Sequence, residues 1–237
     1  MRRRFFVDAF EADRAVLTGE AANHLGRVLR GEAGQIYELS DGSTVWLAKI
    51  ERAGKDRVEF SLVETVPVVA ASLDKILLLA VVKFDAFEWA LEKATELGVN
   101  RIVPLAAARS EKGLLTAAPK RAERWRKIVF EASQQSRRVR LPFIGELVKP
   151  EVAFRQSAGS LKLTLSERAD ASLLREILQG QNPGCVSLAV GPEGGWTEAE
   201  LSAAQHAGFK EASLGTLILR TETAVTACLA AVNYALE

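Results

Sequence analysis

The sequence has few of the residues that build covalently linked or metal-stabilised scaffolds. Its 237 residues include two cysteines, Cys185 and Cys228, and two histidines, His24 and His206. Two cysteines cannot form a disulfide framework and suit a reducing compartment, so we expect a cytoplasmic protein in which both are small buried residues. Because these four residues also lack the spacing of zinc ligands, we expect no metal site.

Long hydrophobic runs are missing as well. The longest aliphatic run covers the seven residues 76–82, whereas a membrane-spanning helix needs about 20. The basic start of the chain is soon interrupted by Asp8, Glu11 and Asp13, so we expect neither a membrane segment nor a signal peptide. With 48% hydrophobic and 26% charged residues, the composition is that of a soluble globular protein and excludes disorder and collagen.

The net charge of +1 hides an uneven distribution of charge. Residues 1–140 contain 24 Lys and Arg against 19 Asp and Glu, whereas residues 141–237 contain 7 against 11. Residues 120–140 alone hold eight basic and two acidic side chains. Such a stretch is typical either of a solvated helix face or of a surface that meets a polyanion.

The first part of the chain, residues 1–68, is predicted to be rich in β-structure. An Asp-Gly pair at positions 41–42 indicates a hairpin, and residues 57–62 alternate between polar and apolar. Residues 20–30 are predicted to form a short helix. Its apolar face is expected to hold Leu25, Val28 and Leu29. This pattern indicates a small β-barrel with an inserted helix, followed by a linker at residues 65–72.

From residue 73 to the end, strands alternate with helices, which predicts an α/β domain built on a parallel sheet. Strands are expected at residues 75–82, 101–105, 161–165, 186–190 and 209–214. Helix starts are expected at the Asp85–Glu88 pair, at Pro119, at the Thr197–Glu200 pair and at Thr221.

Three of these strands end in unusual loops, at residues 165–168, 191–195 and 214–224. In open α/β sheets, ligands bind beyond the carboxyl ends of the strands. The glycines at 191, 194 and 195 let the backbone approach a ligand closely, although GPEGG could also be only a tight turn. We therefore predict a ligand site where the three loops meet.

The loops favour one class of ligand. The chain has neither a GxxxxGK[ST] motif nor a GxGxxG motif that opens a helix, so it lacks the usual phosphate-binding loops of nucleotide sites. Glu167, Glu193 and Glu222 would repel phosphate. Aliphatic and acidic side chains around bare backbone suit an uncharged purine joined to a cation, and S-adenosylmethionine has that composition.

Five segments carry a resemblance to a known family: HLGRVLR (24–30), KFDAFEWALEKATELGV (83–99), RWRKIVFEASQQSRR (124–138), GPEGGWTEAE (191–200) and LGTLILRTETA (214–224). The sequence resembles the ribosomal RNA small subunit methyltransferase E family of the SPOUT superfamily. The resemblance implies a PUA-like barrel, a SPOUT domain with a deep trefoil knot, and a homodimer. It also implies methylation of N3 of a uridine in 16S ribosomal RNA, with S-adenosylmethionine as cofactor and the RNA or the small ribosomal subunit as partner.

The resemblance also implies roles for particular residues. The cofactor-binding residues would be Leu165, Ser166, Glu167, Gly191, Pro192, Glu193, Gly194, Gly195, Leu214, Gly215, Leu217, Ile218, Leu219, Thr223 and Ala224. The RNA-contact candidates are Arg2, Arg3, Arg4, Arg27, Arg30, Lys83, Arg109, Arg137 and Arg138, each of which could also be a solvated surface charge. Gln134 and Gln135 could line the acceptor-base pocket or lie at a dimer contact.

Three residues are candidates for the chemistry. Arg220 would stabilise the uracil anion, with a phosphate or structural contact as its alternative. Glu193 or Glu222 would be the base, and Glu222 could instead only complement a helix dipole. Two other functions remain open: a SPOUT methyltransferase for another RNA site or for ribose, and a non-catalytic RNA-binding module.

Overall fold

The computed structural model describes residues 3–69 and 72–237, which form two units. The first unit consists of the described residues up to 69 together with Ser133–Leu141. The second unit consists of residues 72–132 and Pro142–Glu237. The inclusion of Ser133–Leu141 in the first unit has no counterpart in the sequence pattern, which places this segment inside the domain of residues 73–237.

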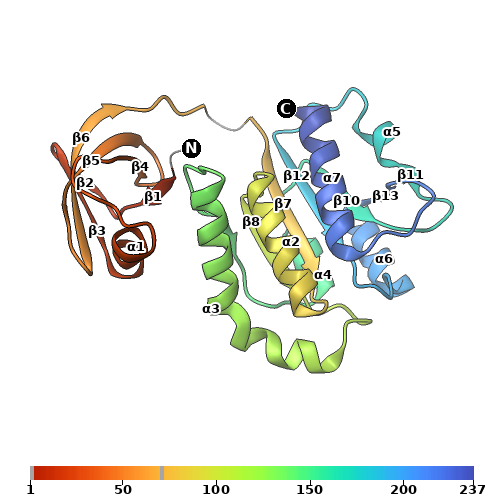
Figure 1. Cartoon of the computed structure of the whole chain (residues 1–237). Helices are drawn as coiled ribbons and strands as arrows, with labels where there is room; N and C mark the ends of the chain where they lie inside the picture. The colour runs from red at the N-terminus through yellow and green to blue at the C-terminus, as the bar shows by residue number, and fades with distance from the viewer. Residues whose placement is uncertain (1–2, 70–71) are drawn as a thin grey trace. The chain divides into compact units, whose positions relative to one another are not determined.

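The first unit is a six-stranded sheet that curls on itself (Figure 1), in the order β1-β4-β5-β6-β3-β2. Its elements are β1 (Arg4–Phe6), β2 (Phe10–Glu11), β3 (Arg14–Thr18), α1 (Gly19–Asn23), the π-helix η1 (His24–Val28), β4 (Ile36–Ser40), β5 (Val45–Ala53) and β6 (Arg57–Thr65). β4 and β5 pair antiparallel across the predicted hairpin, with Ser40 opposite Val45. The alternation along β6 buries Val58 and Phe60 in the core of this unit.

The predicted helix of residues 20–30 is present, but Val28 does not lie on its buried face. Leu25 is buried, whereas Val28 is 67% exposed. The reason is the π-helical turn of η1, in which the amide of Leu29 donates to the carbonyl of His24 at 3.0 Å. This i→i+5 spacing adds a residue to the turn and moves Val28 off the helical stripe.

The second unit is built on a seven-stranded sheet in the order β11-β13-β10-β12-β7-β8-β9, and every pairing in it is parallel as predicted. Its strands are β7 (Asp74–Ala80), β8 (Arg101–Leu105), β9 (Phe143–Ile144), β10 (Leu161–Leu165), β11 (Ser172–Leu173), β12 (Cys185–Val190) and β13 (Lys210–Ser213). Its helices are α2 (Phe84–Glu96), α3 (Lys112–Gln135), α4 (Pro150–Gln156), α5 (Leu174–Leu178), α6 (Glu198–His206) and α7 (Thr221–Leu236).

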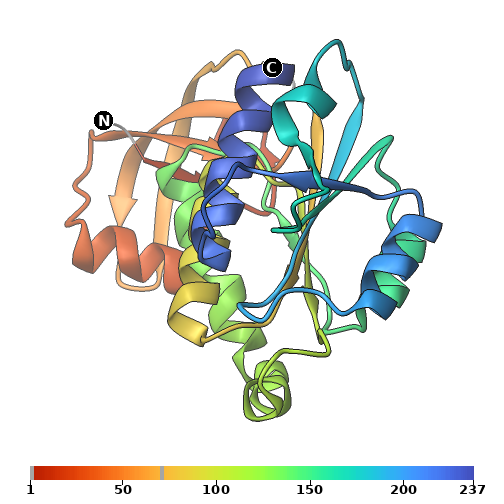
Figure 2. The ribbon, with the colours of Figure 1, turned by 90° about the vertical axis from the view of Figure 1, so that its right-hand side faces the viewer.

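Both faces of this sheet are covered, as the continuous apolar run of β7 predicts. Leu77 and Leu79 pack on one face with residues of α2, α3, α5 and α7. Leu78 and Ala80 pack on the other face with residues of α4 and α6. Figure 2 shows α7 and α6 on opposite sides of the sheet.

Two predicted helix starts are wrong and two are correct. α2 begins at Phe84 after Lys83, without a side-chain cap. Glu88 does not cap it, because the Glu88 carboxylate pairs with Arg121 and Arg124 of α3. At α6, by contrast, the expected capping box of Thr197 and Glu200 is complete, and α7 begins at Thr221.

α3 begins at Lys112, so Pro119 lies inside the helix instead of opening it. Proline lacks an amide donor and clashes with the preceding turn, which bends a helix at that point. Figure 1 shows α3 changing direction in its first half. After the bend, Trp125, Val129 and Ala132 are buried as expected. None of the helices in the described residues combines the length and the apolar character needed to cross a bilayer.

Candidate functional site

The three predicted loops follow strands that are neighbours in the sheet. β10 lies between β12 and β13, and all three run parallel. Their carboxyl ends therefore lie at one edge of the sheet, where the following loops enclose a pocket of about 260 Å³. The pocket lies entirely within the second unit.

Most of the residues predicted to bind a cofactor line this pocket. They are Leu165, Ser166, Glu167, Gly191, Pro192, Glu193, Gly195, Leu214, Gly215, Leu217, Ile218, Leu219 and Ala224. Gly194 and Thr223 are not in its wall. Thr223 is exposed in the first turn of α7, and Gly194 contacts the side chain of Arg109 instead.

The wall also contains residues that were not predicted to bind a cofactor. These are Arg109, Arg168, Val190, Trp196, Glu198, Leu201, Ala212, Ser213 and Thr221. Arg168, Trp196, Glu198 and Thr221 lie within the quoted loops and segments, and Val190 and Ser213 directly precede them. Arg109 is different: it follows β8, was expected to contact RNA, and no motif joins it to the pocket.

Trp196 and Thr221 fix the three loops to one another. The buried indole of Trp196 donates from Nε1 to the carbonyl of Leu165 at 3.0 Å. The Thr221 hydroxyl donates to the carbonyl of Gly191 at 3.1 Å. Each hydrogen bond joins two segments that lie far apart in the sequence, so the wall of the pocket is held by its own side chains.

All three glycines of the GPEGG segment are restricted by the protein itself. A Cβ atom on Gly191 would lie 3.0 Å from the Trp196 ring, and one on Gly194 would lie 3.3 Å from Cβ of Arg109. Gly195 has a φ of +69°, a conformation that favours glycine. The glycines therefore allow close packing inside the protein, in addition to any approach of a ligand.

The three candidate catalytic residues lie in or beside the pocket. Glu193 lines it and is exposed. Arg220 is the exposed N-cap residue of α7 and lies between the lining residues Leu219 and Thr221. Glu222 is in the first turn of α7, the position at which a carboxylate complements the helix dipole.

The two arginines of the pocket wall differ in their ion pairs. Arg168 forms ion pairs with Asp170 and Glu198, and its hydrogen bonds to Glu198 and then Asp170 raise its pKa. Arg109 donates from Nη1 to the carbonyl of Gly194 at 2.7 Å. Within the described part of the chain it has no ion pair, so its positive charge is not neutralised.

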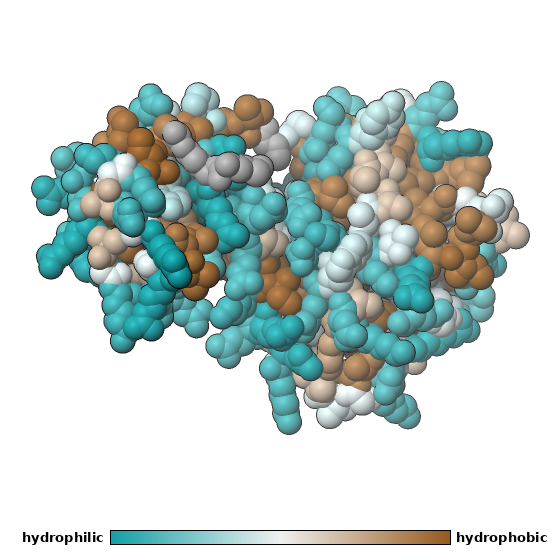
Figure 3. All heavy atoms as spheres, viewed as in Figure 1, coloured by the Kyte–Doolittle hydropathy of each residue, from teal (hydrophilic) through white to brown (hydrophobic). Residues whose placement is uncertain are grey.

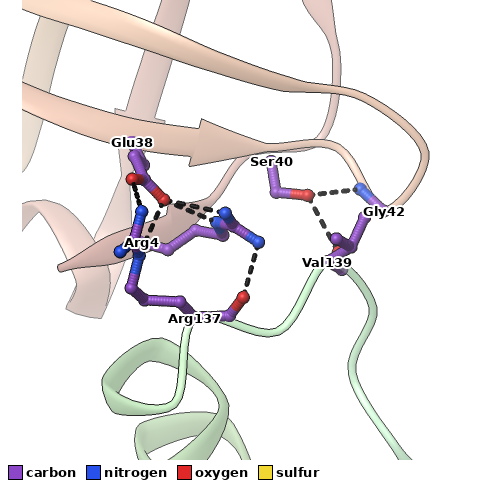
Figure 4. A network of polar contacts seen from close by, with 6 residues as sticks. All are labelled: Arg4, Glu38, Ser40, Gly42, Arg137 and Val139. Carbon is purple, nitrogen blue, oxygen red and sulfur yellow. Dashed lines mark hydrogen bonds and ion pairs between the residues drawn. The ribbon is translucent and has the colours of Figure 1, made fainter. Parts of the chain in front are cut away.

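Two of the predicted RNA contacts, Arg4 and Arg137, form ion pairs inside the first unit (Figure 4). Arg4 is 6% exposed and binds the buried carboxylate of Glu38, which also binds Arg137. Arg4 further donates to the carbonyl of Arg137. Burial and pairing leave little of Arg4 exposed to solvent, and Arg137 is engaged by the same carboxylate. Arg138 is half-buried, which lowers its pKa, and donates from Nε to the carbonyl of Arg140.

Other candidates remain on the surface. Arg3, Arg27, Arg30 and Lys83 are exposed, and a side-chain nitrogen of Arg3 lies 3.2 Å from Nε2 of His24. Arg2 lies outside the described residues.

Four further residues lie away from the pocket wall. Gln134 is buried, Gln135 is exposed, and Cys228 is buried as expected, whereas Cys185 is only half-buried. No group of three or more His, Cys, Asp or Glu residues suited to a metal ion occurs in the described ranges.

Both parts of the chain match models of known protein families. Residues 70–233 match the family described as RNA methyltransferase domain, and residues 17–63 match the family described as RNA methyltransferase PUA domain.

Named relatives agree with these matches. The ribosomal RNA small subunit methyltransferase E of Synechocystis is 36% identical over 93% of this chain and 73% of its own length. That of Bacillus subtilis is 30% identical over 99% and 97%. The crystal structure of the same enzyme from Neisseria gonorrhoeae, bound to S-adenosylmethionine, is 30% identical and covers 100% of this chain and 98% of its own, with a TM-score of 0.89. The chain therefore belongs to the ribosomal RNA small subunit methyltransferase E family.

Proposed function

We propose that this protein uses S-adenosylmethionine to methylate N3 of a uridine in 16S ribosomal RNA. The observation that carries the proposal is the pocket between the loops after β10, β12 and β13 in a chain of this family. The relative from Neisseria gonorrhoeae binds the same cofactor. Because ribosomal RNA would be the substrate of this protein, we also propose that the protein is cytoplasmic.

The residues of the pocket fit this cofactor. Leu217 and Ile218 are 79% and 80% exposed, so their aliphatic side chains are available to cover an adenine ring. The acids Glu167 and Glu193 suit the positive charges of the methionine part and disfavour phosphate. When bound, S-adenosylmethionine supplies a methyl group on a positively charged sulfur.

The protein must prepare the uracil for this transfer. A neutral N3–H group has no free lone pair in the plane of the ring, so its proton must leave. Glu193 would accept this proton, with Glu222 as the second candidate. Arg220 would stabilise the negative charge that develops on the uracil, because its guanidinium offers several N–H donors and has no hydrogen bond to the described residues.

The first unit would bind the RNA. We assign it as a PUA-like barrel over residues 1–68, joined to a SPOUT domain over residues 73–237 with a deep trefoil knot. Arg3, Arg27 and Arg30 of this unit would contact phosphates and position the substrate without reading its sequence. Lys83 of the second unit would also contact a phosphate.

We also propose a homodimer formed partly by α7. One stripe of α7, including Val225 and Val232, is buried against the sheet. Ala231, Ala235 and the 94%-exposed Tyr234 instead line a second, largely apolar cavity of about 670 Å³. Figure 3 shows hydrophobic atoms gathered near α5 and the loop after β13, beside α7. Light scattering that gives the mass of a monomer with full activity would contradict the dimer.

Product analysis tests the reaction. The enzyme should convert unmodified 16S RNA or small subunits, and mass spectrometry against standards should identify 3-methyluridine. Arg220→Ala should lower kcat by about 100-fold or more with little change in cofactor affinity, the scale for losing one well-placed donor. Recovery of 2′-O-methyl or C5-methyl uridine would refute the N3 assignment. Absence of any cofactor binding would indicate a binding module without activity.

A further inference from the structure

We infer that Arg109 binds the carboxylate of the methionine part of S-adenosylmethionine and that the buried Glu200 positions it to do so. The inference rests on the proposed function. It assigns a ligand contact to a residue that the sequence placed in the RNA-binding set.

The first argument is the charge balance of the pocket. The cofactor carries a sulfonium, an ammonium group and a carboxylate. Glu167 and Glu193 can face the two cations, whereas the wall contains two guanidinium groups for the anion. Arg168 already pairs with Asp170 and Glu198. Arg109 forms no ion pair with any described residue, so among the residues of the wall it is the cation available to a carboxylate.

The second argument is that the position of Arg109 is fixed by the protein. Glu200 is 2% exposed. One of its carboxylate oxygens accepts from the amide of Ala108 at 2.8 Å. The other accepts from the amide and the hydroxyl of Thr197, both at 2.8 Å. Glu200 therefore holds the residue before Arg109 against the start of α6.

The side chain of Arg109 is fixed at its far end as well. Its Nη1 donates to the carbonyl of Gly194 at 2.7 Å, and its stem would be the nearest neighbour of a Cβ atom on Gly194. Four other N–H donors of the guanidinium remain, and a planar guanidinium can bind a carboxylate through two of them. Anchoring at both ends reduces the rotamer entropy that ligand binding would otherwise cost.

A phosphate of the RNA is the competing anion. The acids in the same wall disfavour it, since a polyanion would approach Glu167 and Glu193 together, whereas the cofactor brings two positive charges with its carboxylate.

The test is a binding cycle by calorimetry. It uses the whole enzyme, S-adenosylmethionine, and its decarboxylated form, which keeps the adenosine, the sulfonium and the amine. The unmodified enzyme should bind the decarboxylated form about 10- to 100-fold more weakly, as expected for losing a hydrogen bond between charged groups. Arg109→Ala should weaken binding of S-adenosylmethionine by a similar factor and should leave binding of the decarboxylated form nearly unchanged.

Two further variants complete the cycle. Arg168→Ala is the matched control, because this arginine lines the same pocket but is already paired, so it should weaken both ligands equally. Glu200→Gln keeps one acceptor and should weaken S-adenosylmethionine more than the decarboxylated form, a selectivity that loss of fold stability alone would not give. Thermal unfolding of each variant checks that it is folded.

The outcomes separate this inference from the proposed function. If Arg109→Ala weakens both ligands by the same factor, Arg109 does not bind the carboxylate and the inference is wrong while the methyltransferase stands. If Arg109→Ala raises only the KM for RNA, the anion is a phosphate and the inference is again wrong. If the unmodified enzyme binds neither ligand, the proposed function fails and this inference fails with it.

Discussion

The carboxylate of Glu38 binds the guanidinium of Arg4 inside the first unit, at 3.0 Å to Nε and 2.8 Å to Nη2. The same carboxylate accepts from Arg137, which lies 99 residues further along the chain. Nearby, the Ser40 hydroxyl donates to the carbonyl of Val139 at 2.8 Å. These contacts attach the segment of residues 133–141 to strands β1 and β4 and explain why it belongs to the first unit.

Removing the carboxylate should destabilise the first unit strongly. Glu38→Ala would leave the buried guanidinium of Arg4 without its carboxylate partner, and breaking a buried ion pair in this way costs about 3–5 kcal/mol. The free energy of unfolding is measured by urea denaturation, with circular dichroism as the signal. Glu59→Ala, which breaks the exposed pair with Arg57, is the control and should cost less than about 1 kcal/mol. Equal losses in the two variants would show that the Glu38 cluster adds nothing beyond a surface ion pair.

Gly191→Ala should damage the cofactor pocket through Trp196. The added Cβ would lie 3.0 Å from Cε2 of the indole and 3.1 Å from Nε1, and the ring is held by its bond to Leu165. Displacing it should cost about 1–3 kcal/mol of stability, as overpacking does, and should weaken cofactor binding measured by calorimetry. Gly184→Ala is the control, because a Cβ there has no neighbour within 4 Å. Unchanged cofactor affinity in Gly191→Ala would mean that the pocket tolerates movement of the Trp196 ring.

The buried thiol of Cys228 should make stability depend on pH in the alkaline range. Burial raises the pKa of Cys228 from 9.0 to about 12. Since the folded state keeps this proton while the unfolded state loses it, the contribution of Cys228 is fully present below pH 9 and falls between about pH 9 and 12. The slope from this one group is about 1.4 kcal/mol per pH unit. Denaturant unfolding of the unmodified protein and of Cys228→Ala should therefore differ in slope above pH 9 and run parallel below it. Parallel curves over the whole range would contradict the shift.

The exposed arginines after α1 should contribute a salt-dependent part of RNA binding. Arg27→Gln and Arg30→Gln should each reduce the slope of log K against log salt by about 0.7, the value for one phosphate contact on a single strand. Lys49→Gln is the control, since Lys49 pairs with Glu51 on β5. Binding would be measured by fluorescence anisotropy with an RNA fragment at several salt concentrations. A slope that changes as much in the control would show that the arginines act only through net charge.

Local sequence patterns predicted much of the fold correctly. The alternation of residues 57–62, the apolar run of residues 76–82 and the capping pair Thr197–Glu200 each depend on burial or hydrogen bonding within a few residues. For the same reason the three loops of the pocket could be predicted, because each follows its own strand directly. The patterns gave wrong predictions at two positions where the observed helix differs from the local expectation. Pro119 lies inside α3 instead of opening it, and Val28 is displaced from the buried face by the π-helical turn.

The sequence by itself therefore determined the longer strands of the parallel sheet, several of the helices, and which loops carry the residues of the pocket. Only the tertiary structure decided that β10 lies between β12 and β13, which brings the three loops to one edge of the sheet. It also decided that Arg109 reaches the pocket while Arg4 is withdrawn from solvent by Glu38. The physical reason is the sequence distance over which each interaction acts. Hydrophobic periodicity depends on the burial of residues that are close in the sequence. The partner of a charged side chain, by contrast, depends on contacts between distant residues, such as the hydrogen bond that joins Ala108 to Glu200, 92 residues apart.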